Sequence, residues 1–208
     1  MLITFEGIEG SGKSTQISRV VQALSNSGRD VIATVEPGGT ELGMNLRSIL
    51  LDSNTGSLDP LAELFLFSAA RSELLFEVIK PAIADGKIVL CDRFVDSTLA
   101  YQGYGRGLEI EMVAEINRTV CAGVWPNLTI WLDLPVDVGL NRAIGRLNQN
   151  NSIEGRFEKE DVLFHTRVQD GFKSIAKQEP DRVKRVDSCE SIENVSSKII
   201  QLVNEAIS

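Results

Sequence analysis

Short apolar runs alternate with amphipathic stretches along almost the whole chain. The apolar runs cover residues 1–6, 31–35, 87–91 and 128–134, and a more polar run covers residues 182–187. Their length and their β-branched residues predict strands, with the last strand at or near a sheet edge. Between them, apolar residues recur at spacings of three and four, which predicts helices that each bury one face.

The helical pattern begins directly after the first predicted strand. The apolar residues that would share this first helix face are Ile17, Val20, Val21 and Leu24. Further helices are predicted at 41–51, 61–84, 109–122, 135–146, 157–176 and 190–207, with a shorter helix-like segment at 94–102. Pro81 predicts a bend in the longest helix, because proline cannot donate a backbone hydrogen bond. Residues 103–107 contain repeated glycines and are predicted to form a flexible loop.

Strands that alternate with helices predict an α/β fold with a five-stranded parallel sheet and helices on both faces. We find no repeat, low-complexity tract or linker, and the length suits a single domain over residues 1–208. One stretch, about 147–158, is polar and asparagine-rich and carries or adjoins Arg142, Arg146 and Arg156. It is either a surface loop or a mobile lid that brings arginines over phosphate groups.

The composition limits the kinds of partner that the chain is expected to bind. It is 43% hydrophobic and 24% charged, as in ordinary globular proteins, and its formal net charge is −8. This balance disfavours a nucleic acid partner, although a few arginines can still form a local site for a small anion. Cys91, Cys121 and Cys189 form neither a disulfide framework nor a metal-binding pattern. Without a signal peptide or an apolar run long enough to span a membrane, we expect a cytoplasmic protein with no membrane partner.

The loop after the first strand carries the most specific chemistry. Its sequence is Gly7-Ile8-Glu9-Gly10-Ser11-Gly12-Lys13-Ser14-Thr15, which fits the P-loop pattern G-x-x-x-x-G-K-[ST] between a strand and a helix. Glycines and the helix N-terminus turn backbone N–H groups toward a phosphate. Lys13 would reach the β- and γ-phosphates, and the Ser14 hydroxyl would hold Mg²⁺. The pattern therefore predicts a nucleoside triphosphate site.

Other polar residues follow the ends of later strands, where open α/β sheets bind ligands. Glu36-Pro37 follow the second strand, and Asp92-Arg93 follow the third, from which Asp92 could reach the metal. Phe67 and Arg71 are spaced i, i+4, which fits a binding pair or a core phenylalanine beside a surface arginine equally well. We interpret His165, the single histidine, as a surface or packing residue rather than a ligand or an acid–base group.

A small chain with a P-loop and a second arginine-rich anion site indicates phosphoryl transfer between small molecules. GTPases carry a guanine-reading Asn-Lys-x-Asp motif and a D-x-x-G switch, and we find neither in a suitable place. Transfer to a phosphate acceptor requires positioning and charge neutralisation rather than a strong base.

Taken together and in order, the motifs resemble those of bacterial thymidylate kinases, and the resemblance extends over nearly the whole chain. Besides the P-loop with its preceding Phe5-Glu6, they are Glu36-Pro37-Gly38-Gly39-Thr40, Phe67-Ser68-Ala69-Ala70-Arg71, Asp92-Arg93-Phe94 and Ser97-Thr98-Leu99-Ala100-Tyr101-Gln102-Gly103. The resemblance implies a P-loop NTPase fold of three α/β/α layers with an arginine-bearing lid. It also implies transfer of the γ-phosphoryl group of ATP to dTMP in dTTP synthesis, with Mg²⁺, by a homodimer.

The resemblance also implies roles for individual residues. ATP would contact Gly7, Glu9, Gly10, Ser11, Gly12, Lys13, Ser14 and Thr15, and the metal would lie at Ser14 and Asp92. dTMP would contact Glu9, Glu36, Pro37, Arg47, Phe67, Arg71, Arg93, Ser97, Tyr101 and Gln102. Within this set, Phe67 would stack on thymine, Arg71 would bond its carbonyl edge, and Tyr101 would exclude a ribose 2′-OH. Arg47 and Arg93 would bind the acceptor phosphate, and Glu9 would face the 3′-OH region of the sugar.

The P-loop interior lacks a basic residue, so the catalytic arginine is expected in the lid, as in the bacterial branch of the family. We favour Arg146 and Arg156 over Arg142, together with Lys13 and Arg93 as catalytic residues. Phe94 departs from the family pattern, where tyrosine is also common at this position. The alternatives are a deoxynucleoside kinase with Glu36 or Asp92 as base, another nucleoside monophosphate kinase, or a nucleotide-binding protein without catalysis.

Overall fold

The computed structural model describes residues 1–150 and 153–207, and its described part contains a five-stranded parallel sheet with the order β2-β3-β1-β4-β5. The strands are β1 (Leu2–Glu6), β2 (Val31–Val35), β3 (Ile88–Asp92), β4 (Leu128–Asp133) and β5 (Val183–Asp187). The predicted parallel sheet is confirmed, and the polar strand β5 lies at an edge. Because all strands run in the same direction, the segments that follow β1, β2 and β3 meet at one end of the sheet.

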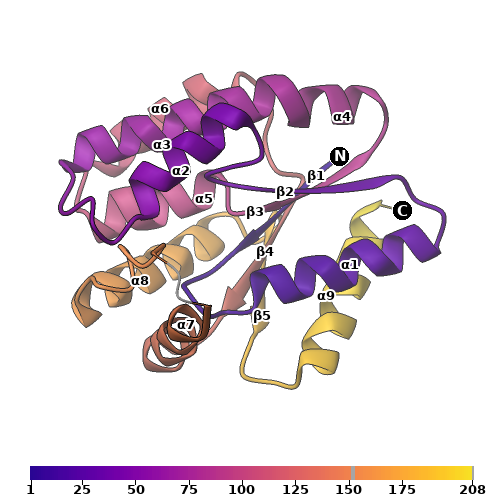
Figure 1. Ribbon diagram of the computed structural model, residues 1–208. Coiled ribbons are helices and arrows are strands. Elements are labelled where there is room, and N and C mark those ends of the chain that lie inside the picture. Colours follow the sequence, from indigo (N-terminus) through magenta and orange to yellow (C-terminus); the bar gives the residue numbers. More distant parts are fainter. Residues whose placement is uncertain (151–152, 208) are drawn as a thin grey trace.

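Helices cover both faces of this sheet (Figure 1). The helices are α1 (Lys13–Asn26), α2 (Glu41–Leu51), α3 (Pro60–Leu74), α4 (Lys80–Ala84), α5 (Val95–Thr98), α6 (Ile110–Cys121), α7 (Val136–Asn150), α8 (Val162–Gln178) and α9 (Ile192–Ile207), with π-helical segments η1 (Leu75–Ile79) and η2 (Leu99–Gly105). In Figure 1, α1 and α9 lie on one side, and α2 to α6 lie on the other. Helix α8 packs on η2 and also contacts β4 and β5.

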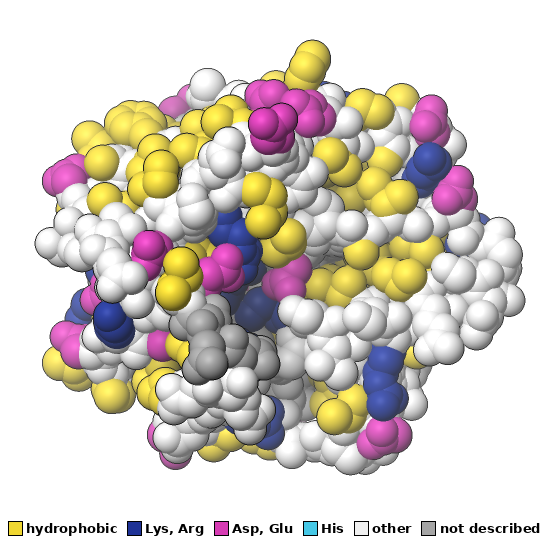
Figure 2. Space-filling model, in the orientation of Figure 1, with side chains coloured by type: hydrophobic (Ala, Val, Ile, Leu, Met, Phe, Trp, Pro, Cys, Tyr) yellow, Lys and Arg dark blue, Asp and Glu magenta, His cyan; other side chains and the backbone are white. Residues whose placement is uncertain are grey.

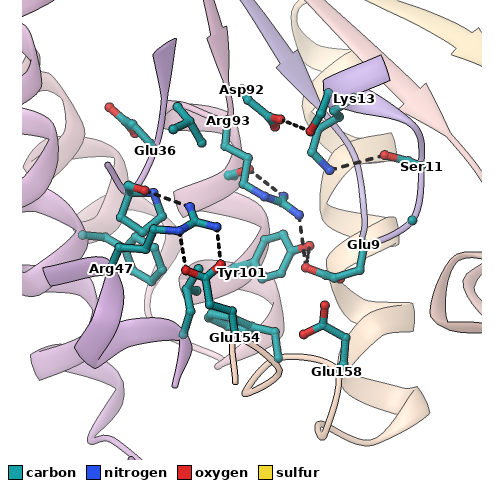
Figure 3. Close-up of a pocket in the computed structure, with 18 of the residues that line it drawn as sticks. Glu9, Ser11, Lys13, Glu36, Arg47, Asp92, Arg93, Tyr101, Glu154 and Glu158 are labelled. Carbon is teal, nitrogen blue, oxygen red and sulfur yellow. Dashed lines mark hydrogen bonds and ion pairs between the residues drawn. The ribbon is translucent and has the colours of Figure 1, made fainter. Parts of the chain in front are cut away.

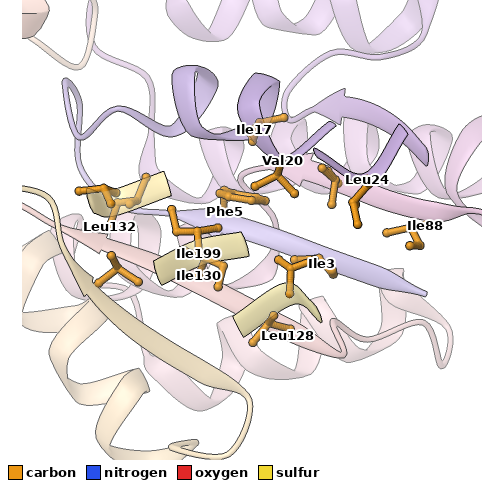
Figure 4. Packing of buried hydrophobic residues seen from close by; sticks show 14 residues of the cluster. Ile3, Phe5, Ile17, Val20, Leu24, Ile88, Leu128, Ile130, Leu132 and Ile199 are labelled. Atoms are coloured by element: carbon orange, nitrogen blue, oxygen red, sulfur yellow. The ribbon is translucent and has the colours of Figure 1, made fainter. Parts of the chain in front are cut away.

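Alternation along the strands produces a separate core on each face of the sheet. Ile3 and Phe5 of β1 pack with Ile130 of β4 and with residues of α1 and α9 (Figure 4). Leu2, which points the other way, packs with η1 and α4. Side chains two residues apart share one face of a strand, so a central strand that is buried throughout, as β1 is, contributes apolar side chains to both cores. The sheet is thereby held rigidly under the loops at its carboxyl end.

Two predicted loop regions differ in the structure. Residues 103–105 belong to the π-helical segment η2 rather than to a flexible loop. A Cβ atom on Gly105 would lie 2.7 Å from the ring of Phe164, so the glycine permits close packing of η2 on α8. Helix α7 extends to Asn150 and includes the first residues of the predicted 147–158 lid, and Asn151 and Ser152 of that lid lie outside the described residues.

Two predicted helices also have different limits. The predicted helix over 61–84 is divided into α3, η1 and α4, and the π-helical segment η1 ends at Ile79, two residues before Pro81. The helix predicted from residue 157 begins at Val162, because the Asp161 carboxylate caps it by accepting from the Phe164 amide at 2.6 Å. Over the described residues, no helix is both long and apolar enough to cross a membrane.

Candidate active site

The P-loop turns between β1 and α1 and places a buried lysine at the carboxyl end of the sheet. Lys13 Nζ donates to the carbonyl oxygens of Gly7 and Ile8, at 3.0 Å each. Burial, with a contribution from Arg93, lowers the pKa of Lys13 to about 8, although nearby carboxylates oppose the shift. Gly10 has φ +70°, and a Cβ atom there would lie 2.2 Å from the Gly139 carbonyl oxygen of α7. This buried cation, held by backbone carbonyls and the Ser11 hydroxyl, forms an anion site.

Beside the lysine, a hydroxyl and a carboxylate meet. Ser14 Oγ donates to Asp92 Oδ2 at 2.9 Å, which joins the start of α1 to the end of β3. These two oxygens fit the needs of Mg²⁺, which binds one or two protein oxygens and completes its octahedron with waters and phosphates. Across the described residues, no group of three or more histidines, cysteines or carboxylates forms a further metal cluster.

The P-loop forms one end of a cavity of about 530 Å³. Figure 2 shows a hollow with Lys and Arg side chains deep inside it and Asp and Glu side chains around them, and Figure 3 shows its walls. The predicted site residues that line it are Glu9, Gly10, Ser11, Gly12, Lys13, Ser14, Thr15, Glu36, Pro37, Arg47, Phe67, Arg71, Asp92, Arg93, Ser97, Tyr101, Gln102, Arg146 and Arg156. Gly7 and Arg142 are not among the lining residues, although the Gly7 carbonyl binds both Lys13 and Arg93.

At the end of the cavity away from the P-loop, Arg71 is fixed from several sides. Its Nε donates to Glu36 Oε2 at 2.8 Å, Nη1 to Asn117 Oδ1 at 2.7 Å, and Nη2 to Thr98 Oγ1 at 2.8 Å. Burial would lower the pKa of Arg71, but Glu36 outweighs burial and raises it. The guanidinium also lies 5.0 Å from the centre of the Phe94 ring. Arg71 is therefore a charged donor with one orientation, beside the aromatic wall formed by Phe67.

Between the two ends, Glu9 and Arg93 form a second charged pair. Arg93 Nη2 lies 3.1 Å from Glu9 Oε1, and the Tyr101 hydroxyl donates to the same oxygen at 2.6 Å. Burial opposes ionisation of Glu9, yet His165 beside Oε2, the charge of Arg93, the Tyr101 hydroxyl and the charge of Lys13 together lower its pKa to about 2. Arg93 itself has φ 70°, which turns its side chain from the end of β3 back toward the P-loop.

Arg47 of α2 pairs with a residue from the segment that follows α7. Its Nε and Nη2 donate to Glu154 Oε1 and Oε2 at 2.9 and 2.7 Å, and its Nη1 donates to the Pro37 carbonyl at 2.9 Å (Figure 3). The Glu154 segment is tied to the end of α2, because the Ser53 amide donates to the Ile153 carbonyl at 2.8 Å. A planar carboxylate thus occupies a guanidinium fork that also suits a phosphate.

The two arginines expected to act from the lid are placed differently. Arg146 is an exposed residue of α7 that lines the cavity. Arg156 is buried, with Nη1 2.7 Å from Glu63 Oε2 and Nε donating to the Leu50 carbonyl. Its Nη2 has no hydrogen-bond partner among the described residues. Both side chains border the cavity, and their roles in transfer stay predictions.

The structure adds residues that the sequence did not indicate. Three further residues line the cavity, namely Phe157, Glu154 and Glu158. Three more contact lining residues from outside the cavity: Asn117 bonds Arg71, Glu63 pairs with Arg156, and His165 lies beside Glu9. A signal existed for Asn117: it falls four residues from both Val113 and Cys121, on the buried stripe of α6. His165 is completely buried, as one of its two interpretations expected, but it faces the Glu9 carboxylate rather than only apolar neighbours.

Comparisons with known proteins agree with this geometry. The family model described as thymidylate kinase matches residues 5–199. The chain is 46% identical to the thymidylate kinase of Geobacter sulfurreducens over 97% of this chain and 95% of that protein. It is 50% identical to the thymidylate kinase of Desulfovibrio desulfuricans over 94% and 91%. The crystal structure of thymidylate kinase from Ehrlichia chaffeensis superimposes with a TM-score of 0.78 at 36% identity, covering 98% of each chain.

Proposed function

The chain belongs to the thymidylate kinase family, and from this we propose how its cavity carries out the phosphorylation of dTMP by ATP to dTDP. The observation that supports the proposal best is the shape of the cavity. A phosphate site at Lys13, Ser14 and Asp92 occupies one end, and a buried arginine beside an aromatic ring occupies the other. A triphosphate and a phosphorylated nucleoside can therefore approach each other from opposite ends.

At the donor end, the P-loop backbone from Gly10 to Thr15 binds the ATP phosphates. Lys13 already donates to backbone carbonyls, so it can exchange these bonds for phosphate oxygens without moving far. Ser14 and Asp92 would hold Mg²⁺, which would supply positive charge against the β- and γ-phosphates. Glu9, which is part of the P-loop, faces the acceptor.

At the acceptor end, thymine stacks on Phe67, and Arg71 donates to a carbonyl of the base. Such stacking contributes about 1–3 kcal/mol for each base. Gln102 and Ser97 line the base pocket, and Tyr101 packs against the sugar where a 2′-hydroxyl would lie. Glu36 acts indirectly in this arrangement, because it fixes Arg71.

The acceptor phosphate lies between Arg47 and Arg93 and points one of its oxygens at the γ-phosphorus of ATP. That oxygen is already ionised, so it attacks without a general base while the bond to the β,γ-bridging oxygen breaks and ADP leaves. Lys13, Arg93 and the arginines Arg146 and Arg156 neutralise the charge that is spread over the transferred group. A closed lid over residues 147–158 would also exclude water.

We propose that the protein works in the cytoplasm as a homodimer, without nucleic acid, and that residues 1–208 form one domain. Large apolar side chains on α2 and α3 support a second copy as partner, since Met44 and Phe65 are 52% and 53% exposed. Figure 2 shows hydrophobic side chains gathered on this side of the molecule. Sedimentation should give a dimer for the unmodified chain and a monomer for Phe65→Asp. A monomer in both cases would contradict the proposal.

An assay of ADP release tests the substrate assignment. We expect turnover with dTMP to exceed that with dUMP, CMP and AMP, and no turnover with thymidine, which has no phosphate for Arg47 and Arg93. Turnover of thymidine without turnover of dTMP would overturn the assignment. Lys13→Ala should abolish transfer to each acceptor and serves as the background control.

A further inference from the structure

The two oxygens of the Glu9 carboxylate have different surroundings. Oε1 accepts from Tyr101 and Arg93, as described above. Oε2 lies 3.4 Å from Nδ1 of His165 on α8. Within the described part of the chain, neither Glu9 Oε2 nor His165 Nδ1 has a hydrogen-bond partner, although both atoms are buried. Two buried polar atoms without other partners therefore face each other.

The other ring nitrogen of His165 also faces an oxygen. His165 Nε2 lies 3.0 Å from the backbone carbonyl of Phe157, which can only accept. A neutral imidazole has one N–H donor, so it would leave a lone pair directed at one of these two oxygens. The imidazolium has a donor on each nitrogen and satisfies both. Donation from Glu9 instead would require a protonated carboxyl, which the Arg93 guanidinium 3.1 Å from Oε1 and the Tyr101 hydroxyl that donates to Oε1 disfavour.

The neighbours of the ring favour the same assignment. His165 is completely buried, and its neighbour Phe164 packs edge-on against it with ring centres 5.3 Å apart. The charged and titratable groups around the Glu9–His165 pair are Arg93 at the end of β3, Tyr101 of η2, Lys13 of α1 and Glu158, which follows Phe157. Among the described residues, Glu9 is the charged group that approaches the imidazole within ion-pair distance.

We propose that His165 is a positioning residue, protonated on both nitrogens, that fixes the Glu9 carboxylate and connects it to the segment beside Arg156. The connection runs from Glu9 through the imidazole to the Phe157 carbonyl. Displacement of the segment that carries Arg156 and Phe157 removes one of the two acceptors that hold the ring. The orientation of Glu9 is thereby coupled to the position of the lid. The effect on catalysis rests on the proposed placement of the dTMP sugar against Glu9.

Because His165 is the single histidine of the chain, a ¹⁵N-labelled sample without a histidine tag gives one imidazole to observe. We expect both nitrogens to be protonated at pH 7 in the wild type. In Glu9→Gln the carboxylate is gone, and we expect Nδ1 to lose its proton at the same pH. A wild-type ring with an unprotonated Nδ1, or an imidazolium that persists in Glu9→Gln, would overturn the proposal. These measurements need no enzymatic activity.

Kinetics then test whether the contact matters for the acceptor. His165→Phe keeps the aromatic packing but removes both donors, and the loss of one charge-assisted hydrogen bond should raise KM for dTMP about tenfold while KM for ATP stays unchanged. His165→Gln should restore part of the difference, since its amide still donates. Thr166→Ala, which changes the next, exposed residue of α8, is the matched control and should behave as the wild type.

A double-mutant cycle separates this inference from the proposed function. If His165 acts through Glu9, then His165→Phe should raise KM for dTMP much less in a Glu9→Gln background than in the wild type. An unchanged KM in folded His165→Phe, or strictly additive effects, would contradict the positioning role. If Glu9→Gln alone leaves KM for dTMP unchanged, the proposed placement of the sugar is wrong, whereas the ¹⁵N result still decides the His165 contact.

Discussion

Two arginine–glutamate pairs of similar geometry lie in the same cavity, one at each end of the proposed acceptor site. Arg71 lies 2.7 Å from Glu36 and Arg47 lies 2.7 Å from Glu154, and in both pairs the arginine Nε also donates. Their exposure differs: the side chains are 2% and 5% exposed in the first pair and 23% and 37% in the second. The first pair is built into the core, and the second remains open to solvent and ligand.

The difference follows from where the partners originate. Glu36 and Thr98 belong to segments that follow strands, Asn117 comes from a packed helix, and together they fix Arg71 in place. Glu154 comes from a segment outside the sheet that touches the end of α2 through backbone bonds. In the proposed function Arg71 reads a base and requires one orientation, whereas Arg47 receives a phosphate and requires a partner that can leave. Burial thus separates a fixed pair from an exchangeable one.

The largest expected effect is on stability, at the buried pair. Glu36→Gln leaves the Arg71 charge without its counterion, and breaking a buried ion pair costs about 3–5 kcal/mol. Glu154→Gln is the matched substitution at the exposed pair and should cost about 0–1 kcal/mol. Urea unfolding of both variants measures the free energies. Equal losses for the two variants would show that exposure does not distinguish the pairs.

Lys13 is a buried cation that can be compared with the arginines of these two pairs. Its bonds within the described chain go to carbonyl and hydroxyl oxygens, and in the proposed function its counterion is a phosphate of the substrate. With a pKa of about 8 in the fold against 10.5 for an ordinary lysine, its charge destabilises the nucleotide-free protein by about 3 kcal/mol below pH 8. Lys13→Met should therefore be more stable than the wild type at pH 7, although inactive. The advantage should shrink as pH rises from 8 to 10.5, since the folded wild type then loses the proton.

Unfolding of both proteins across this pH range checks the prediction, and groups common to both cancel in the difference. A gap that grows with pH would show that the Lys13 charge is stabilised rather than penalised in the fold. Saturation with ATP should reverse the order at pH 7, because only the wild type gains a phosphate partner for its lysine.

The two arginines predicted to act from the lid also differ in burial, since Arg146 is exposed and Arg156 is buried. Arg156→Ala removes charge-assisted bonds to Glu63 and to the Leu50 carbonyl and should cost about 1.5–3 kcal/mol of stability, in addition to lowering turnover. Arg146→Ala removes an exposed side chain and should lower turnover with stability within about 0.5 kcal/mol of the wild type. Thermal unfolding beside steady-state kinetics separates the two effects. Full turnover in the double variant would exclude both arginines from catalysis.

These contrasts also show how far the sequence could predict the site. The strands, the P-loop and the end of β3 follow from local patterns, so the sequence alone was enough to place Lys13, Ser14 and Asp92 together. Arg71 could be predicted to face the site only with the help of a family resemblance. Its partner Asn117 is 46 residues away along the chain, and Glu154 is 107 residues from Arg47. Such pairings depend on helix packing, which apolar periodicity does not specify, and so the buried and exposed pairs could not be distinguished from sequence.

The smallest expected effect is the most specific for the exchangeable pair. If the dTMP phosphate must displace Glu154 from Arg47, then Glu154→Gln should lower KM for dTMP by about two- to fivefold, which corresponds to a partly exposed ion pair of up to about 1 kcal/mol. Glu160→Gln is the control, because Glu160 lies on the same segment but pairs with Arg106 at 2.6 Å. It should leave KM for dTMP unchanged. A KM that rises in Glu154→Gln would mean that the carboxylate orients Arg47 for the phosphate instead of competing with it. The two pairs would then differ in exposure, but in both of them the carboxylate would orient the arginine.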